Sequence, residues 1–212
     1  LDDKIGDLLA ALEATGQAED TAVVFLSDHG DMLGERGLWF KMSFYEGSAR
    51  VPLTIAAPGQ AASCVTDPVS TIDLCPTLCE IAGVSMDAVM PWTEGRSLLP
   101  QMNGNPRTAP VAMEYAAEGS YAPVVALRQG RWKYTACTLD PEQLFDLVAD
   151  PHEMTNRATD PDCAEILARF RDMAADRWDL VRFDAEVRES QARRWVVYEA
   201  LRQGGYYPWD FQ

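Results

Sequence analysis

Hydrophobic positions in the first half of the chain alternate between two periods. A helical spacing at the start predicts an amphipathic helix that Gly16 can end, with apolar positions Leu1, Ile5, Leu8, Leu9 and Leu12. Residues 21–26 and 53–57 are short apolar runs, which predict two strands, the first of them buried. Residues 72–81 return to helical spacing. Because strands and helices alternate, the pattern predicts an α/β layered core.

The second half of the chain carries different patterns. Residues 86–110 are rich in Pro, Gly and Asn and predict a surface connection. An antiparallel meander is predicted next, with strands at residues 124–128, 132–136 and 142–148. Residues 161–204 then show one apolar helical face, formed by Cys163, Ile166, Leu167, Phe170, Met173, Ala174 and Trp178.

These patterns predict three parts. Residues 1–110 form an α/β core, residues 111–160 a small antiparallel β subdomain, and residues 161–212 a helical extension. The extension ends in an aromatic segment without periodicity, residues 204–212.

Composition narrows the classes of function. The chain has 212 residues, of which 47% are hydrophobic, enough for a sizeable core. A formal net charge of −15 argues against a nucleic-acid partner, whose phosphates would be repelled. No apolar run is long enough to span a bilayer, so no membrane partner is expected. The five cysteines have no regular spacing, which favours reduced thiols and a cytoplasmic protein.

A polar cluster follows the first predicted strand. Asp28 and His29 stand at the end of that strand, where open α/β sheets place their ligand chemistry, and Lys41 follows in the same loop. A carboxylate beside a neutral imidazole suits a divalent metal ion. On position alone, solvated loop residues remain the alternative.

Residues 21–58 closely resemble the second metal-binding strand and loop of the sulfatase family, in the alkaline phosphatase superfamily. The resemblance continues in 95–100 (GRSLLP), 130–134 (GRWKY), 142–147 (EQLFDL), 150–153 (DPHE) and Asn156. Residues 41–52 and 201–210 look most like the choline sulfatases. The implied fold is the carboxyl-terminal part of an alkaline-phosphatase-like α/β sandwich, with the β subdomain and helical extension attached.

The resemblance implies roles for the polar cluster. Asp28 and His29 match metal ligands of the family; Ca²⁺ is favoured, and the imidazole nitrogen makes Mn²⁺ the alternative. Lys41 matches a catalytic lysine that binds a sulfuryl or bridging ester oxygen as charge develops. The family nucleophile is a formylglycine made from a C/S-x-P-S-R motif, which this sequence lacks. We therefore expect the carboxyl-terminal portion of a longer enzyme, inactive alone.

A choline sulfate substrate would need a site for its quaternary ammonium. Because this group has no N–H donor, aromatic faces and carboxylates must recognise it. Glu114 and Glu118 offer carboxylates, and Trp209 with Asp210 offers both kinds of group near the end of the chain. Solvated carboxylates and a packing tail are the alternatives. The tail could also reach a neighbouring subunit, so a homo-oligomer is expected.

Two other functions stay open from the sequence. A phosphonate monoester or phosphodiester hydrolase could carry the same metal loop. A non-catalytic module could use its tail for oligomerisation and keep only a vestige of the metal site.

Overall fold

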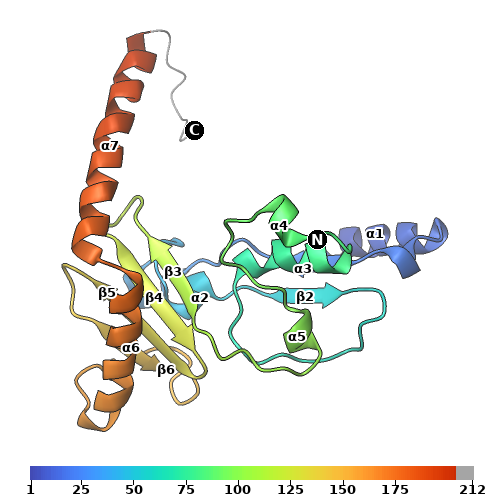
Figure 1. Cartoon of the computed structure of the whole chain (residues 1–212), viewed down its shortest axis with the longest axis horizontal. Helices are drawn as coiled ribbons and strands as arrows, with labels where there is room; N and C mark the ends of the chain where they lie inside the picture. The colour runs from blue at the N-terminus through green and yellow to red at the C-terminus, as the bar shows by residue number, and fades with distance from the viewer. Residues whose placement is uncertain (204–212) are drawn as a thin grey trace. The chain divides into compact units, whose positions relative to one another are not determined.

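The computed structural model describes residues 1–203 of the chain (Figure 1). The chain divides into two compact units. The first unit consists of Leu1–Val111 with Arg128–Gly130, and the second of Ala112–Leu127 with the chain from Arg131 onward. The helical segment after residue 160 thus shares a unit with the sheet, and the division into three parts stays a prediction.

The first unit contains the predicted helices and strands. Helix α1 spans Asp2–Ala14, strand β1 Val23–Leu26, strand β2 Leu53–Ala56 and helix α3 Leu74–Ile81. Short helical elements lie between and after them: 3₁₀ turns at Ala18–Asp20, Glu35–Gly37 and Thr71–Asp73, and helices α2 (Glu46–Ala49), α4 (Met86–Val89) and α5 (Leu99–Met102). Gly16 and Gly83 follow α1 and α3 with φ values of +68° each, a backbone conformation that suits glycine and ends a helix.

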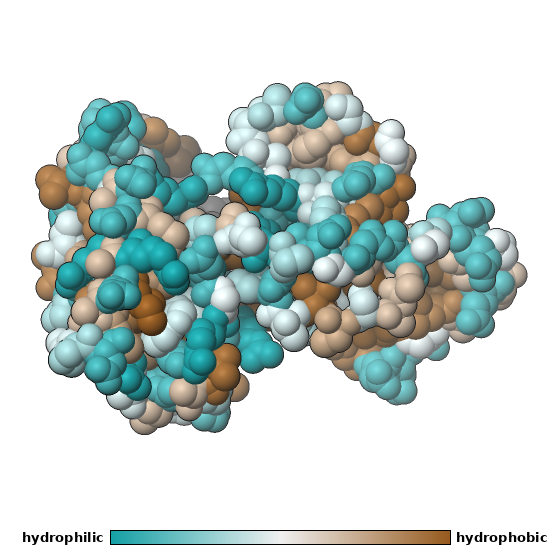
Figure 2. Space-filling view, turned by 60° about the horizontal axis from the view of Figure 1, so that its bottom comes forward, coloured by the Kyte–Doolittle hydropathy of each residue, from teal (hydrophilic) through white to brown (hydrophobic). Residues whose placement is uncertain are grey.

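The prediction that the first strand is buried is wrong for the described residues. Strand β1 pairs with β2 alone, antiparallel, with Val23 opposite Ala56 and Leu26 opposite Leu53. Both faces of a two-stranded sheet must be covered by other elements to be buried. Here this cover is incomplete, and Phe25 remains 43% exposed. Helix α1 has no buried residue either. Hydrophobic surface, brown in Figure 2, is accordingly open over the part of this unit that carries α1.

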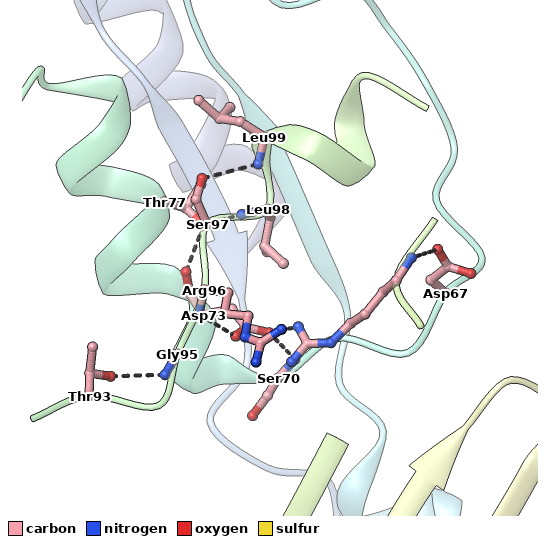
Figure 3. Close-up of polar contacts among 11 residues, drawn as sticks. Asp67, Ser70, Asp73, Thr77, Thr93, Gly95, Arg96, Ser97, Leu98 and Leu99 are labelled. Carbon is pink, nitrogen blue, oxygen red and sulfur yellow. Dashed lines mark hydrogen bonds and ion pairs between the residues drawn. The ribbon is translucent and has the colours of Figure 1, made fainter. Parts of the chain in front are cut away.

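Residues 86–110 are more than a surface connection, which corrects that prediction. Asp73 is fully buried, and its carboxylate accepts hydrogen bonds from the backbone N–H groups of Ser70 and Arg96, both at 2.9 Å. The Arg107 guanidinium pairs with the same carboxylate at 2.5 Å. Figure 3 shows the segment around Gly95 and Arg96 lying against Asp73. A buried anion therefore holds this polar segment to the start of α3.

Two neighbouring contacts fasten the same segment. The Thr77 hydroxyl donates to the Asp73 carbonyl at 2.6 Å and accepts from the Leu98 N–H at 2.9 Å (Figure 3). At Gly95, a Cβ would lie 2.1 Å from the Ile72 carbonyl oxygen, so only glycine fits there.

The second unit is built on a four-stranded antiparallel sheet, as the predicted meander requires. Its strands are β3 (Val111–Tyr115), β4 (Val124–Gln129), β5 (Trp132–Cys137) and β6 (Gln143–Asp146), in the order β3-β4-β5-β6. The sequence pattern did not predict β3 as a separate strand. A 3₁₀ turn at Pro161–Cys163 leads into helix α6, Ala164–Arg177, which lies against the sheet in Figure 1.

The predicted apolar face of α6 forms the core of this unit. Cys163, Leu167 and Phe170 are buried against side chains from three strands, namely Leu127, Tyr134 and Leu144. The rings of Tyr134 and Phe170 stack with centroids 6.0 Å apart. The other predicted members, Ile166, Met173, Ala174 and Trp178, are partly buried around this cluster.

Ion pairs join the segments that carry the family resemblance. Arg131 binds both carboxylate oxygens of Asp146, and Lys133 pairs with Glu153 at 2.5 Å with both side chains 2% exposed. Asn156 Oδ1 accepts a hydrogen bond from the Leu144 N–H at 2.9 Å, and Asn156 Nδ2 donates one to the Glu142 carbonyl. These residues therefore hold β5, β6 and the following turn together.

Helix α7, Leu180–Gln203, differs from α6 because none of its described residues is buried. Ion pairs one turn apart support it: Arg182–Glu186, Asp184–Arg188 and Glu189–Arg193. Its last turns expose an apolar cluster, Trp195, Val196, Val197 and Leu201. Among the described helices, none is long and apolar enough to cross a membrane.

Removing the Asp73 carboxylate should destabilise the first unit strongly. Asp73→Ala leaves the Arg107 guanidinium, itself mostly buried, without its counter-charge, so we expect a loss of about 3–5 kcal/mol in the free energy of unfolding. Urea denaturation measures this loss. Asp87→Ala, at an exposed position of the same unit, should change the value by less than about 0.5 kcal/mol. Equal effects of the two substitutions would contradict the role given to Asp73.

The contribution of Glu142 should depend on pH. Hydrogen bonds from Arg171 and Tyr134, set against burial, lower the pKa of the Glu142 carboxyl below its ordinary 4.5. Because the pKa is lower in the folded state, the stabilisation is complete well above pH 4.5 and is lost as the pH falls through the folded-state value.

Urea denaturation of wild type and Glu142→Gln at about pH 6 and about pH 4 tests this dependence. We expect a difference of up to about 1 kcal/mol at the higher pH and a smaller one at the lower, since the partly exposed Arg171 is screened by solvent. Asp172→Asn, an exposed neighbour on α6, is the control and should show no such trend. A difference that grows on acidification would be incompatible with the lowered pKa.

Candidate metal and catalytic site

The loop after β1 brings the three predicted site residues together. Strand β1 ends at Leu26, and Asp28 and His29 follow after Ser27. The chain then makes an excursion and returns through Lys41 to α2. Nε2 of His29 lies 3.3 Å from Asp28 Oδ2 and 3.2 Å from Lys41 Nζ. A carboxylate oxygen, an imidazole nitrogen and an ammonium thus meet at one place on the first unit.

The hydrogen bonds of His29 set the chemistry of its ring. Nδ1 lies 2.9 Å from the Gly30 carbonyl oxygen, which can only accept, so Nδ1 carries the proton in the neutral ring. Nε2 then presents its lone pair toward Asp28 and Lys41. This is the tautomer that a metal-binding histidine adopts when its second nitrogen donates to a carbonyl.

Asp28 is poised as an anion. The backbone N–H of His29 donates to Oδ1 at 2.9 Å, and this bond, more than the opposing effect of burial, lowers the pKa of the Asp28 carboxyl. The Ser27 hydroxyl lies 3.4 Å from the same oxygen. The side chain is 84% exposed, so its second oxygen is open to a ligand.

Backbone hydrogen bonds fold the excursion back on itself. Met32 N–H donates to Phe40 O at 3.4 Å, and Gly34 N–H donates to Leu38 O at 2.8 Å. Positive φ values of 51°, 96°, 54° and 71° at the tip, in Leu33, Gly34, Arg36 and Gly37, make the reversal. The Arg36 guanidinium lies over the Tyr45 ring, 4.2 Å from its centroid. Several contacts therefore hold the tip in place, and they fix the path of the chain from the tip to Lys41.

The donor set fits part of a divalent metal site. An anionic oxygen from Asp28 and an unprotonated nitrogen from His29 are adjacent ligands of suitable kinds. Within residues 1–203, no group of three or more His, Cys, Asp or Glu side chains is arranged to hold a metal ion. A complete coordination shell would therefore need donors beyond these two side chains.

The predicted substrate-binding residues lie elsewhere in the chain. Glu114 and Glu118 belong to the second unit. The Glu114 carboxylate accepts a hydrogen bond from the Trp178 indole at 2.6 Å, and the Glu118 carbonyl accepts one from the Tyr115 hydroxyl at 2.6 Å. Trp209 and Asp210 lie outside the described residues, so their assignment stays a prediction, as does that of the two glutamates.

One residue of the site carried almost no signal in the sequence. Ser48, in α2 (Glu46–Ala49), is buried and contacts both the Asp28–Gly30 turn and Lys41 through the bonds described below. The only hint was the run of small residues Gly47-Ser48-Ala49, which allows a close approach of backbones.

Comparisons with known proteins identify the family to which the chain belongs. The family profile described as "N-sulphoglucosamine sulphohydrolase, C-terminal" matches residues 34–189. The chain therefore belongs to this family of sulfatase carboxyl-terminal regions, within the alkaline phosphatase superfamily, as the sequence predicted. A second profile, "Choline sulfatase enzyme C terminal", matches residues 185–212.

Individual relatives agree with this membership. The chain is 62% identical over its whole length to a choline-sulfatase of Rhizobium meliloti (strain 1021), of which it covers 42%. A solved 2-O GAG sulfatase aligns with a TM-score of 0.69 and 33% identity over 82% of this chain and 39% of its own.

A phosphonate monoester hydrolase from Silicibacter pomeroyi also aligns, with a TM-score of 0.68 and 33% identity over 83% of this chain and 38% of its own. The chain thus spans less than half the length of each of these relatives.

Proposed function

We propose that this chain is the carboxyl-terminal portion of a choline sulfatase, a sulfuric ester hydrolase that converts choline sulfate and water to choline and sulfate. The observation that carries the proposal is that Asp28 Oδ2 and Lys41 Nζ both lie within 3.3 Å of His29 Nε2. The high identity to a choline-sulfatase and the matching carboxyl-terminal profile support the choice of substrate.

The three side chains divide the work in this proposal. Hydrolysis builds negative charge on the sulfuryl oxygens and on the leaving oxygen. Asp28 and His29 would hold a divalent ion, Ca²⁺ with Mn²⁺ as the alternative, which offsets that charge when bound. The Lys41 ammonium donates hydrogen bonds to a sulfuryl or bridging oxygen. The nucleophile, a formylglycine, belongs to the part of the enzyme that this sequence does not contain, so the 212-residue chain alone has no turnover.

Choline selectivity is assigned to carboxylates and aromatic rings. Glu114 and Glu118 supply negative charge, and Trp209 with Asp210 supplies a π face and a further carboxylate. A desolvated cation–π contact with a quaternary ammonium contributes about 2 kcal/mol, a factor of about 30 in affinity.

A homo-oligomer in the cytoplasm completes the proposal. The exposed apolar cluster at the end of α7 supports self-association, because isolated proteins rarely leave several large apolar side chains in water on one helix. The five cysteines are free, which agrees with a reducing compartment.

The second candidate function is a phosphonate monoester hydrolase, favoured by the structural similarity to solved members of that class. A substrate panel of choline sulfate, an aryl sulfate and a phosphonate monoester separates the two by kcat/KM. The remaining alternative, a non-catalytic oligomerisation module, would leave the full-length protein without bound metal.

Substitutions of Asp28 and of Lys41 should have different effects on the full-length enzyme. Asp28→Ala removes a ligand and should lose both metal and activity, whereas Lys41→Ala should keep the metal and lose on the order of 10²–10³ in kcat. Elemental analysis of purified protein and steady-state kinetics measure the two effects. Asp31→Ala, at an exposed position of the same loop, is the control and should keep both. Loss of metal in Lys41→Ala, or an unchanged kcat, would refute the assignment.

Selectivity should fall when the proposed choline site is weakened. Deleting residues 206–212 should lower kcat/KM for choline sulfate by about 30-fold more than for a neutral aryl sulfate. Glu114→Gln and Glu118→Gln should act in the same direction; the amide oxygen of Glu114→Gln can still accept the Trp178 hydrogen bond, so its effect reports charge. The oligomeric state is followed by light scattering. Equal losses on both substrates would mean that these groups act only structurally.

A further inference from the structure

We infer that Ser48 is a positioning residue that fixes Lys41 against the Asp28–His29 pair. This inference rests on the catalytic role proposed for Lys41. It starts from the burial of Ser48, which is 3% exposed although the loop around it is largely in contact with solvent. A buried serine must satisfy its hydroxyl within the protein, and the partner it uses shows what it holds in place.

The hydroxyl of Ser48 donates to the carbonyl oxygen of Lys41. That carbonyl also accepts the backbone N–H of Ser43 at 2.8 Å. Two donors thus converge on the main chain of the catalytic lysine, one from the turn that follows it and one from α2. Rotation of the Lys41 peptide would break at least one of these bonds.

The backbone of Ser48 reaches the other side of the site. Its carbonyl accepts the Gly30 N–H at 2.8 Å, directly after the Asp28–His29 pair. One residue therefore bridges both arms of the loop, the carbonyl holding the turn with the proposed ligands and the hydroxyl holding the lysine. The 3.2 Å separation of Lys41 Nζ and His29 Nε2 is measured between groups attached to these two fastened points.

The bridge requires an unusually close approach of two backbones. A Cβ on Gly30 would lie 2.1 Å from the Gly47 carbonyl oxygen, and a Cβ on Gly47 would lie 3.3 Å from Met32 Sδ. Met32 is itself buried. The Gly47 carbonyl belongs to the main chain and cannot withdraw, whereas a side chain at Gly47 would require Met32 to shift by a few tenths of an ångström, so glycine at position 30 above all lets α2 sit against the Asp28–Gly30 turn. The geometry therefore belongs to the main chain, with Ser48 as its one side-chain link to Lys41.

A substitution that removes only the hydroxyl tests the link in the full-length enzyme. Ser48→Ala keeps the carbonyl bond to Gly30 and loses the bond to Lys41. We expect a loss on the order of tenfold in kcat, about the value of one hydrogen bond, with bound metal retained. Thr54→Ala is the control: it deletes an exposed hydroxyl on β2 in the same unit and should leave kcat nearly unchanged.

A double-mutant cycle separates positioning from a general loosening of the loop. If Ser48 acts through Lys41, Ser48→Ala should lower kcat in the wild-type background and add almost nothing in the Lys41→Ala background. An equal loss in both backgrounds, or an equal loss in Thr54→Ala, would overturn the inference. An unchanged kcat in Ser48→Ala with a large loss in Lys41→Ala would overturn it too, while the proposed function stands. No loss in Lys41→Ala would remove the proposed role of the lysine and this inference together.

Discussion

The proposed active-site loop depends on the contact between the backbone at Gly30 and the backbone at Gly47. With hydrogen atoms in place of side chains, the two segments come close enough for the Gly30 N–H to bond Ser48. Every group of interest is attached near this contact: the carboxylate and imidazole just before it, and the lysine through the Ser48 hydroxyl. These hydrogen bonds hold the backbone on both sides of the site, so the functional side chains extend from fixed points.

The residues by which the chain is most easily assigned to its family are mostly not those proposed to do chemistry. Arg131, Asp146, Lys133 and Glu153 form ion pairs within the second unit, and Gly95 and Arg96 pack around the buried Asp73. Each has a geometric reason for its identity, such as a two-pronged bond, a buried counter-charge or the absence of a Cβ. Sequence motifs of this kind mark residues that stabilise the fold. The proposed function depends instead on the residues of the short loop after β1.

Hydrophobic period predicted the longer helices and five of the six described strands, because each of these elements is local and its apolar face is regular. It could not predict how much of β1 is covered, which depends on surfaces far along the chain. Nor could composition separate the connection at residues 86–110 from a solvated loop. The backbone N–H groups of Arg96 and Leu98 donate to Asp73 and Thr77, and a polar sequence suits a buried and a solvated segment equally.

The site shows the same division. Asp28, His29 and Lys41 could be grouped from the sequence because they lie in one loop, and their proximity follows from a short excursion of the chain. Ser48 could not be predicted as a site residue, because a single serine carries no charge and belongs to no periodic pattern. The partner of Glu114, the indole of Trp178, lies 64 residues away in the chain, and such a pair becomes visible only when the second unit is folded.

Most helices are stabilised both by contacts along their own length and by packing into a core, whereas helix α7 has only the first kind of support. Its ion pairs support it along its own length, and none of its described residues takes part in a core. A helix of 24 residues is about 36 Å long, so its terminal apolar cluster can lie far from the core at its base. Substitutions in that cluster leave the packing of the second unit untouched. The surface at the end of α7 can thus take part in contacts of its own without a role in the fold that carries it.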